Sequence, residues 1–223
     1  MKKRPRIRHL AFVLSPLALS ACISLPFGKD EDRPPPVMYT LHESNAGTMD
    51  VAADATGRIV VVVPLPELPP GFDSERIAIQ FERDGRLDYF ADAQWSAMLG
   101  ELIQDVVVER ARRQLSQAIV GQPDLVPAAN YRLAVQLTHF GPVYRDSSDV
   151  PPRLDVGLAL TVIELPQQTI KAQLTVKKSA PASENRLGTV TNELKSLLHS
   201  ALDEALEEAS PYITEPQTIV RSE

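Results

Sequence analysis

The stretch RLDVGLALTVIELPQQTIKAQLTVKK, residues 153–178, contains two runs in which apolar and polar residues alternate. Such alternation is typical of a strand that buries only one of its faces. The runs 153–165 and 168–178 are joined by Pro166-Gln167, so we expect them to pair as a hairpin. A hairpin with one apolar face must bury that face against another layer of structure.

Further strands are predicted on the N-terminal side of this hairpin. The apolar run RIVVVV and the alternating run RIAIQF are typical of strands, and Asp84-Gly85 after the second run is a hairpin turn signal. The run NYRLAVQLTHF also alternates, which places Arg132 on the face opposite to Tyr131. These patterns predict strands at 37–41, 58–63, 76–81, 86–90 and 130–140.

Two segments instead have apolar residues at steps of three and four, which is the spacing of an amphipathic helix. The first is expected to begin at Asp92 as its N-cap, with Trp95 at the start of an apolar stripe that ends at Leu115. The second is expected over 189–209, closed by Pro211. The order of elements predicts a single α+β domain over 37–213, in which both helices pack on one face of a mixed or mostly antiparallel sheet. Residues 214–223 are predicted to be a loose C-terminal tail.

The N-terminus has the pattern of an export signal. Residues 1–9 carry five basic residues and no acid, and 10–19 form an apolar run. That run is too short to cross a hydrocarbon core, which takes about 20 helical residues. We therefore expect residues 1–21 to be a cleaved signal peptide.

Cys22 is the single cysteine of the chain, and it follows Leu19-Ser20-Ala21. One cysteine can form neither an intramolecular disulfide nor a thiolate zinc cluster. The four residues 19–22 resemble the lipobox of bacterial lipoproteins. The resemblance implies transfer of a diacylglyceryl group to the Cys22 sulfur, cleavage before Cys22, and acylation of the new amino group. It also implies export to the outer membrane, because Ile23 rather than aspartate follows the cysteine.

The segment after the lipobox is predicted to be a spacer. Residues 22–36 comprise Cys22 and a tether with five consecutive charged residues and three consecutive prolines, which favour an extended, solvated chain. Removal of residues 1–21 leaves 18 basic and 29 acidic residues, a net charge of −11. Such a charge disfavours nucleic acid as a partner. We expect the acyl chains rather than electrostatics to hold the protein to the membrane.

The sequence contains none of the common catalytic or nucleotide-binding motifs that we considered. There is no G-x-S-x-G, P-loop, G-x-G-x-x-G or H-E-x-x-H pattern, and the four histidines are far apart. The paired carboxylates lie in the tether or on the outer face of a predicted helix. We therefore predict a protein without enzymatic activity, metal ion or cofactor.

Two features are candidate binding surfaces. The proline-rich segment VPLPELPPGF, residues 63–72, could contact a partner through Pro64, Leu65, Leu68 and Pro69, or could be a rigid loop that packs on its own domain. Trp95, the sole tryptophan, is more often an anchor of the core than a platform for a ligand.

The order of these motifs resembles the ABC-type transport auxiliary lipoproteins, which include the paraquat-inducible-protein-C type. The shared features are a lipobox, a proline-rich tether, YTL, the RIVVV strand, LDYFADAQWSAMLGELIQDVVV and YRLAVQLTHF. Gln94 departs from the family pattern, which has arginine before the tryptophan. The similarity covers most of residues 37–210.

The resemblance implies a non-enzymatic subunit of a lipid-trafficking ABC system, supporting the integrity of the envelope. The implied partners are an inner-membrane permease, a cytoplasmic ATPase and a periplasmic protein with a mammalian-cell-entry domain. The protein would be lipid-anchored in the bacterial outer membrane with its domain facing the periplasm. Assembly into a homo-oligomer stays open.

Two other function classes are compatible with the lipobox. One is a scaffold or assembly lipoprotein of the envelope without a transporter, which the neighbouring genes would distinguish. The other is a lipid-anchored periplasmic hydrolase, whose activity would depend on one serine, aspartate or histidine.

Overall fold

The computed structural model describes residues 34–43, 58–126, 128–146 and 149–213. The predicted signal peptide, Cys22, most of the tether and the predicted C-terminal tail lie outside these ranges. From Pro35 on, the described residues form one compact α+β unit, as predicted. Its elements are β1 (Val37–Tyr39), β2 (Ile59–Val62), β3 (Arg76–Phe81), β4 (Leu87–Trp95), α1 (Leu99–Gln114), β5 (Ala118–Gly121), β6 (Tyr131–Tyr144), β7 (Arg153–Glu164), β8 (Thr169–Pro181), α2 (Leu187–Ala209) and the 3₁₀ turn Ser210–Tyr212.

The sheet is mixed and is organised around β6, its longest strand. β6 pairs antiparallel with β7, and β7 pairs antiparallel with β8, which confirms the predicted hairpin. The other edge of β6 is shared by three short segments in succession: β2, a single bridge at Glu67, and β3, all running parallel to β6. β4 pairs antiparallel with β3, while β1 and β5 add parallel pairs to β4 and β2.

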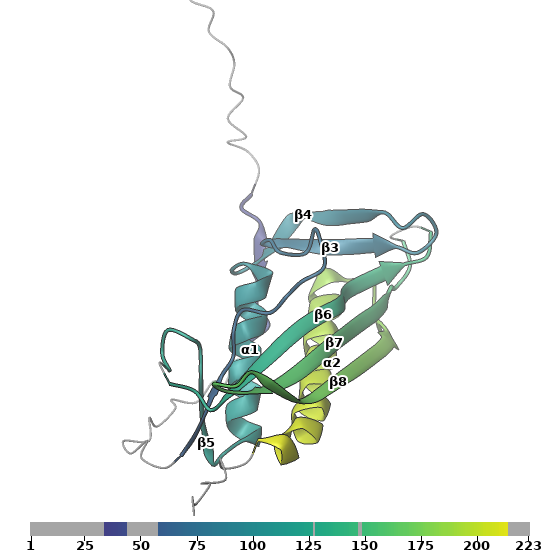
Figure 1. Ribbon diagram of the computed structural model, residues 1–223. Helices are drawn as coiled ribbons and strands as arrows, with labels where there is room; N and C mark the ends of the chain where they lie inside the picture. Colours follow the sequence, from purple (N-terminus) through teal and green to yellow (C-terminus); the bar gives the residue numbers. More distant parts are fainter. Residues whose placement is uncertain (1–33, 44–57, 127, 147–148, 214–223) are drawn as a thin grey trace, which may run out of the picture. The chain divides into compact units, whose positions relative to one another are not determined.

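Both helices cover the same face of this sheet. Figure 1 shows α2 running behind β6, β7 and β8, with α1 beside it. The inward-facing residues of β7 are no more than 1% exposed: Leu154, Val156, Leu158, Leu160 and Val162. Burying one such side chain contributes about 1.5–3 kcal/mol. The alternation of β7 therefore decides which face of the sheet packs against the helices, because a register shift of one residue would turn these five side chains to solvent.

The first helix begins later than its periodicity suggests. α1 starts at Leu99 with Met98 at its N-cap, whereas Asp92 and Trp95 belong to β4, so the prediction of an N-cap at Asp92 is wrong. Gln94 lies opposite Arg76 of β3 on one side and Met38 of β1 on the other. Backbone pairing on both sides thus holds 92–95 extended, although the apolar spacing continues that of the helix.

Other boundaries differ by shorter lengths. β5 was not predicted, because its apolar residues are too few for a clear alternation before the GQPD turn. β6 continues to Tyr144, and α2 begins at Leu187 rather than at 189. The hairpin turn at Asp84-Gly85 is confirmed: Gly85 has φ +66°, and the Asp84 carboxylate accepts a hydrogen bond from the Arg86 amide at 3.1 Å.

Trp95 is a core residue, as the sequence favoured. Its side chain is 2% exposed, and its ring centroid lies 6.1 Å from that of Phe140 on β6. The backbone amide of Trp95 donates to the Glu75 carbonyl at 2.7 Å. The tryptophan therefore joins β4 to β6 beneath the start of α1.

Candidate functional site

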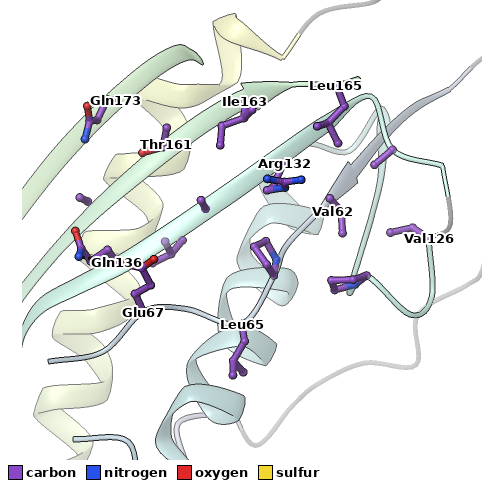
Figure 2. Close-up of a pocket in the computed structure, with 16 residues that line it drawn as sticks. Val62, Leu65, Glu67, Val126, Arg132, Gln136, Thr161, Ile163, Leu165 and Gln173 are labelled. Atoms are coloured by element: carbon purple, nitrogen blue, oxygen red, sulfur yellow. Dashed lines mark hydrogen bonds between the residues drawn. The ribbon is translucent and has the colours of Figure 1, made fainter. Parts of the chain in front are cut away.

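The face of β6 and β7 turned away from the helices forms the base of a groove, which we call the open-face groove. Cross-strand pairs define its rows: Val62, Arg132 and Ile163 form one row across β2, β6 and β7, and Ala134 with Thr161 forms the next. The groove has a volume of about 690 Å³, which lies within the range of about 300–1,000 Å³ that is usual for ligand sites. Figure 2 shows these residues with the segment around Leu65 and the loop around Val126 on the same side of the sheet.

The proline-rich segment forms one wall of this groove. Pro64 and Leu65 line it, and the segment is held to β6 at Glu67, whose amide donates to the Val135 carbonyl at 3.0 Å and whose carbonyl accepts from the Leu137 amide at 2.8 Å. The Glu67 carboxylate also accepts a hydrogen bond from the Gln136 side chain at 3.1 Å. This attachment to a central strand makes the wall a fixed part of the sheet.

The four predicted contact residues of this segment have different environments. Leu65 is 53% exposed, whereas Pro64, Leu68 and Pro69 are partly buried. Leu68 packs against the main core and lies over the beginning of α1, where a Cβ at Gly100 would come within 3.3 Å of it. Leu68 packs on its own domain and Leu65 is exposed to solvent, while contact with a partner stays a prediction.

Arg132 is the single basic residue among the described residues that line the open-face groove. Its side chain is partly buried, and no residue in the described part of the chain forms a hydrogen bond or ion pair with it. The acidic lining residue, Glu67, is bridged to Gln136, four residues along the strand from Arg132. That spacing separates the two backbone positions on β6 by about 13 Å, and the Glu67 carboxylate forms its hydrogen bond with Gln136.

The lining of this groove combines a few polar side chains with many apolar ones. Its described lining residues offer one guanidinium, one carboxylate, two amides and one hydroxyl among apolar side chains, and include no histidine, cysteine or serine. Within the residues that the structure describes, no group of three or more His, Cys, Asp or Glu side chains could hold a metal ion. The groove can orient a ligand through hydrogen bonds and apolar burial.

A second cluster of charges joins the segment after β1 to both helices. The Glu43 carboxylate lies 3.2 Å from the Arg110 guanidinium and 3.1 Å from that of Arg113, both on α1. Arg110 also pairs with Asp203 on α2 at 2.7 Å. The pKa of Glu43 is lowered, first by its hydrogen bond from Arg113, although burial acts against this. The cluster holds the chain after β1 on the helix pair.

His199 is the buried member of this cluster. Its Nε2 lies 3.0 Å from the Leu41 carbonyl oxygen, and its Nδ1 lies 3.2 Å from the Glu43 carboxylate. Burial and, after it, the Arg110 guanidinium lower the pKa of His199 below its ordinary value of 6.5. The neutral ring carries one N–H and can donate to one of the two oxygens.

This environment predicts a loss of stability in mild acid. Because the pKa of His199 is lower in the folded chain, the unfolded chain binds more protons at this residue as the pH falls through about 6.5, so the free energy of unfolding should fall with it. His199→Gln should show a smaller fall than the wild type in urea denaturation across this range. His139→Gln, which changes an exposed histidine, is the matched control. An equal pH dependence in wild type and His199→Gln would contradict the assignment.

Sequence reasoning identified one wall of the groove but not its centre. The alternation of YRLAVQLTHF already placed Arg132 and Gln136 on the face opposite to the buried residues. The alternation did not predict that residues 64–67 and 123–126 would line the groove beside that face, because tertiary contacts alone bring those segments to β6. Cys22 lies outside the described residues, so its predicted lipidation stays a prediction.

Neither α1 nor α2, the two α-helices in the described ranges, combines the length and apolar composition that are needed to cross a bilayer.

Two solved structures share this fold. Protein XCC0632 from Xanthomonas campestris is 20% identical, with 79% of this chain and 93% of that one covered and a TM-score of 0.60. An uncharacterized protein is 12% identical, with coverages of 78% and 99% and a TM-score of 0.60. No curated protein matches the sequence. At these identities the structural likeness establishes the fold alone.

The family comparison covers nearly the whole described domain. A family model for the ABC-type transport auxiliary lipoprotein component matches residues 39–205, from the last residue of β1 into the last turns of α2. The match includes the proline-rich segment, both helices and every strand from β2 to β8. The chain therefore belongs to the family of ABC-type transport auxiliary lipoprotein components.

Proposed function

We propose that this protein is a lipid-anchored, non-enzymatic subunit of an ABC-type lipid-transport system that supports the integrity of the bacterial envelope. The observation that carries the proposal is the family match over residues 39–205. The lipobox ending at Cys22 supplies the anchor, and Ile23 after it favours the outer membrane with the domain on the periplasmic side. The groove supports a binding role, since its lining offers hydrogen-bonding groups beside apolar side chains.

The partner surface in this proposal is the proline-rich wall of the groove. Leu65 is exposed although the segment that carries it is hydrogen-bonded to β6 and packed on α1 through Leu68. An apolar side chain on a rigid support contributes to binding without a large ordering cost. We propose that Leu65 and its neighbouring prolines contact the periplasmic mammalian-cell-entry-domain protein, which links this subunit to the permease and the ATPase.

Site-specific photocrosslinking in cells tests this assignment. A photoreactive amino acid at Leu65 should crosslink to the mammalian-cell-entry-domain partner, identified by mass spectrometry. The same amino acid at Val150 is the matched control, because Val150 is 54% exposed and lies beyond the opposite end of β6. Crosslinks from Leu65 to envelope proteins outside any ABC system would instead favour a scaffold lipoprotein and contradict the proposal.

A further inference from the structure

The guanidinium of Arg132 pairs with no side chain in the described ranges, so it is a candidate group for binding an anionic ligand in the open-face groove. Arg132 stands in one row with Val62 and Ile163, so its charge is flanked by apolar side chains on both neighbouring strands. Figure 2 shows Leu165 close to the same end of the groove. A partly buried cation among apolar groups interacts more strongly with an anion than a solvated cation does, because the local dielectric constant is lower.

Farther along the strands the described lining holds no second cation, and its one carboxylate, that of Glu67, is hydrogen-bonded to Gln136. Ala134 and Ala159 expose a small, flat surface of β6 and β7, and Pro64 and Leu65 form the wall beside it. Hydrogen-bonding groups at Thr161, Gln136 and Gln173 are uncharged. An apolar chain lying here would bury hydrocarbon against these residues while its charged end stays at Arg132.

We propose that the open-face groove binds an amphiphile with one hydrocarbon chain and a carboxylate head, and that Arg132 pairs with the carboxylate. A planar carboxylate matches the guanidinium fork, and its one negative charge is compensated by Arg132, the cation among the described lining residues. The net charge of the chain opposes anions at long range, but such repulsion is screened beyond about 8 Å at physiological ionic strength. The contacts within the groove therefore decide whether the ligand binds.

This inference deepens the function proposed above and rests on it for the source of the amphiphile, although binding itself is measured independently. The full-length protein in phosphatidylcholine nanodiscs is irradiated with a photoreactive fatty acid, and the labelled peptides are located by mass spectrometry. A probe with the same chain and a trimethylammonium head is the matched comparison. We expect the carboxylate probe to label peptides from 64–67, 132–136 and 159–165, and the ammonium probe to leave them unlabelled.

Substitutions separate the charge from the shape of the groove. Arg132→Gln should weaken labelling by about tenfold or more, since a hydrogen-bonded pair with a charged group is lost, whereas Arg132→Lys should retain part of it. Ala134→Trp should block labelling by filling the groove without removing the cation. Arg145→Gln changes an exposed arginine near the other end of β6 and should have no effect.

The outcomes distinguish this inference from the proposed function. Equal labelling by the two probes, or labelling that neither Arg132→Gln nor Ala134→Trp reduces, would overturn the amphiphile site. Such a result combined with an intact crosslink from Leu65 would leave the proposed function standing. Loss of the Leu65 crosslink in Arg132→Gln, with unchanged labelling by the fatty acid, would identify the groove as a site for an acidic segment of the partner and would also overturn the inference.

Discussion

Cys22→Ala is expected to abolish incorporation of radioactive palmitate and to leave the protein outside the outer-membrane fraction or retained with its signal uncleaved. The reason is chemical, because alanine has no nucleophilic atom to accept the diacylglyceryl group. Each buried methylene of an acyl chain contributes about 0.8 kcal/mol to membrane binding, and stable anchoring needs two or more such signals. Loss of the sulfur therefore removes the anchor as a whole.

The matched control for this experiment is Ser24→Ala, which alters a residue of similar size two positions away and keeps the thiol. It should incorporate palmitate at the wild-type level. Undiminished label in Cys22→Ala would refute the lipobox assignment. It would also remove the basis for placing the domain on a tether in the envelope.

Trp95→Ala is expected to have the largest effect on the stability of the folded domain. Trp95 is 2% exposed and packs on Phe140, so its truncation leaves a cavity between β4, β6 and the start of α1. Aromatic-to-alanine changes in cores cost about 3–5 kcal/mol, which is a large fraction of the total stability of about 5–15 kcal/mol that is usual for a domain. Urea denaturation followed by circular dichroism measures the loss.

Two further variants serve as comparisons for the stability of Trp95→Ala. Trp95→Phe keeps an aromatic ring in the cavity and should lose less stability than Trp95→Ala. Met98→Ala changes a 37% exposed residue three positions along the chain, and surface changes of this kind usually stay within about 0.5 kcal/mol. If Trp95→Ala unfolded at the urea concentration of the wild type, the packing of β4 on β6 described above would be wrong.

The open-face groove was only partly predictable from local sequence patterns. Alternation assigned Arg132 to the face of β6 opposite to Tyr131, and the prolines of 63–72 indicated a rigid segment after a strand. Neither pattern contains the information that Glu67 bridges to Gln136, 69 residues later in the chain. The groove exists only because that bridge places the proline-rich wall beside the exposed face of β6.

The same limit explains the boundary of α1. The apolar positions from Trp95 to Leu115 fit one helical stripe, and for Leu99 onward this prediction is confirmed. At Trp95 the stripe coincides with a strand whose alternate residues, Ala93 and Trp95, are also buried. Periodicity cannot separate the two where a strand runs directly into a helix, because both place an apolar residue at that position.

Local alternation and helical spacing were sufficient for the α+β class, for the β7–β8 hairpin and for two helices on one face, because these features depend on which side chains neighbouring residues bury. The order of strands around β6, the extended conformation of 92–95 and the isolation of Arg132 among Val62 and Ile163 were decided by contacts between distant residues. The physical reason is that a strand obtains its partners, and an arginine its electrostatic surroundings, from segments that only the folded chain brings together.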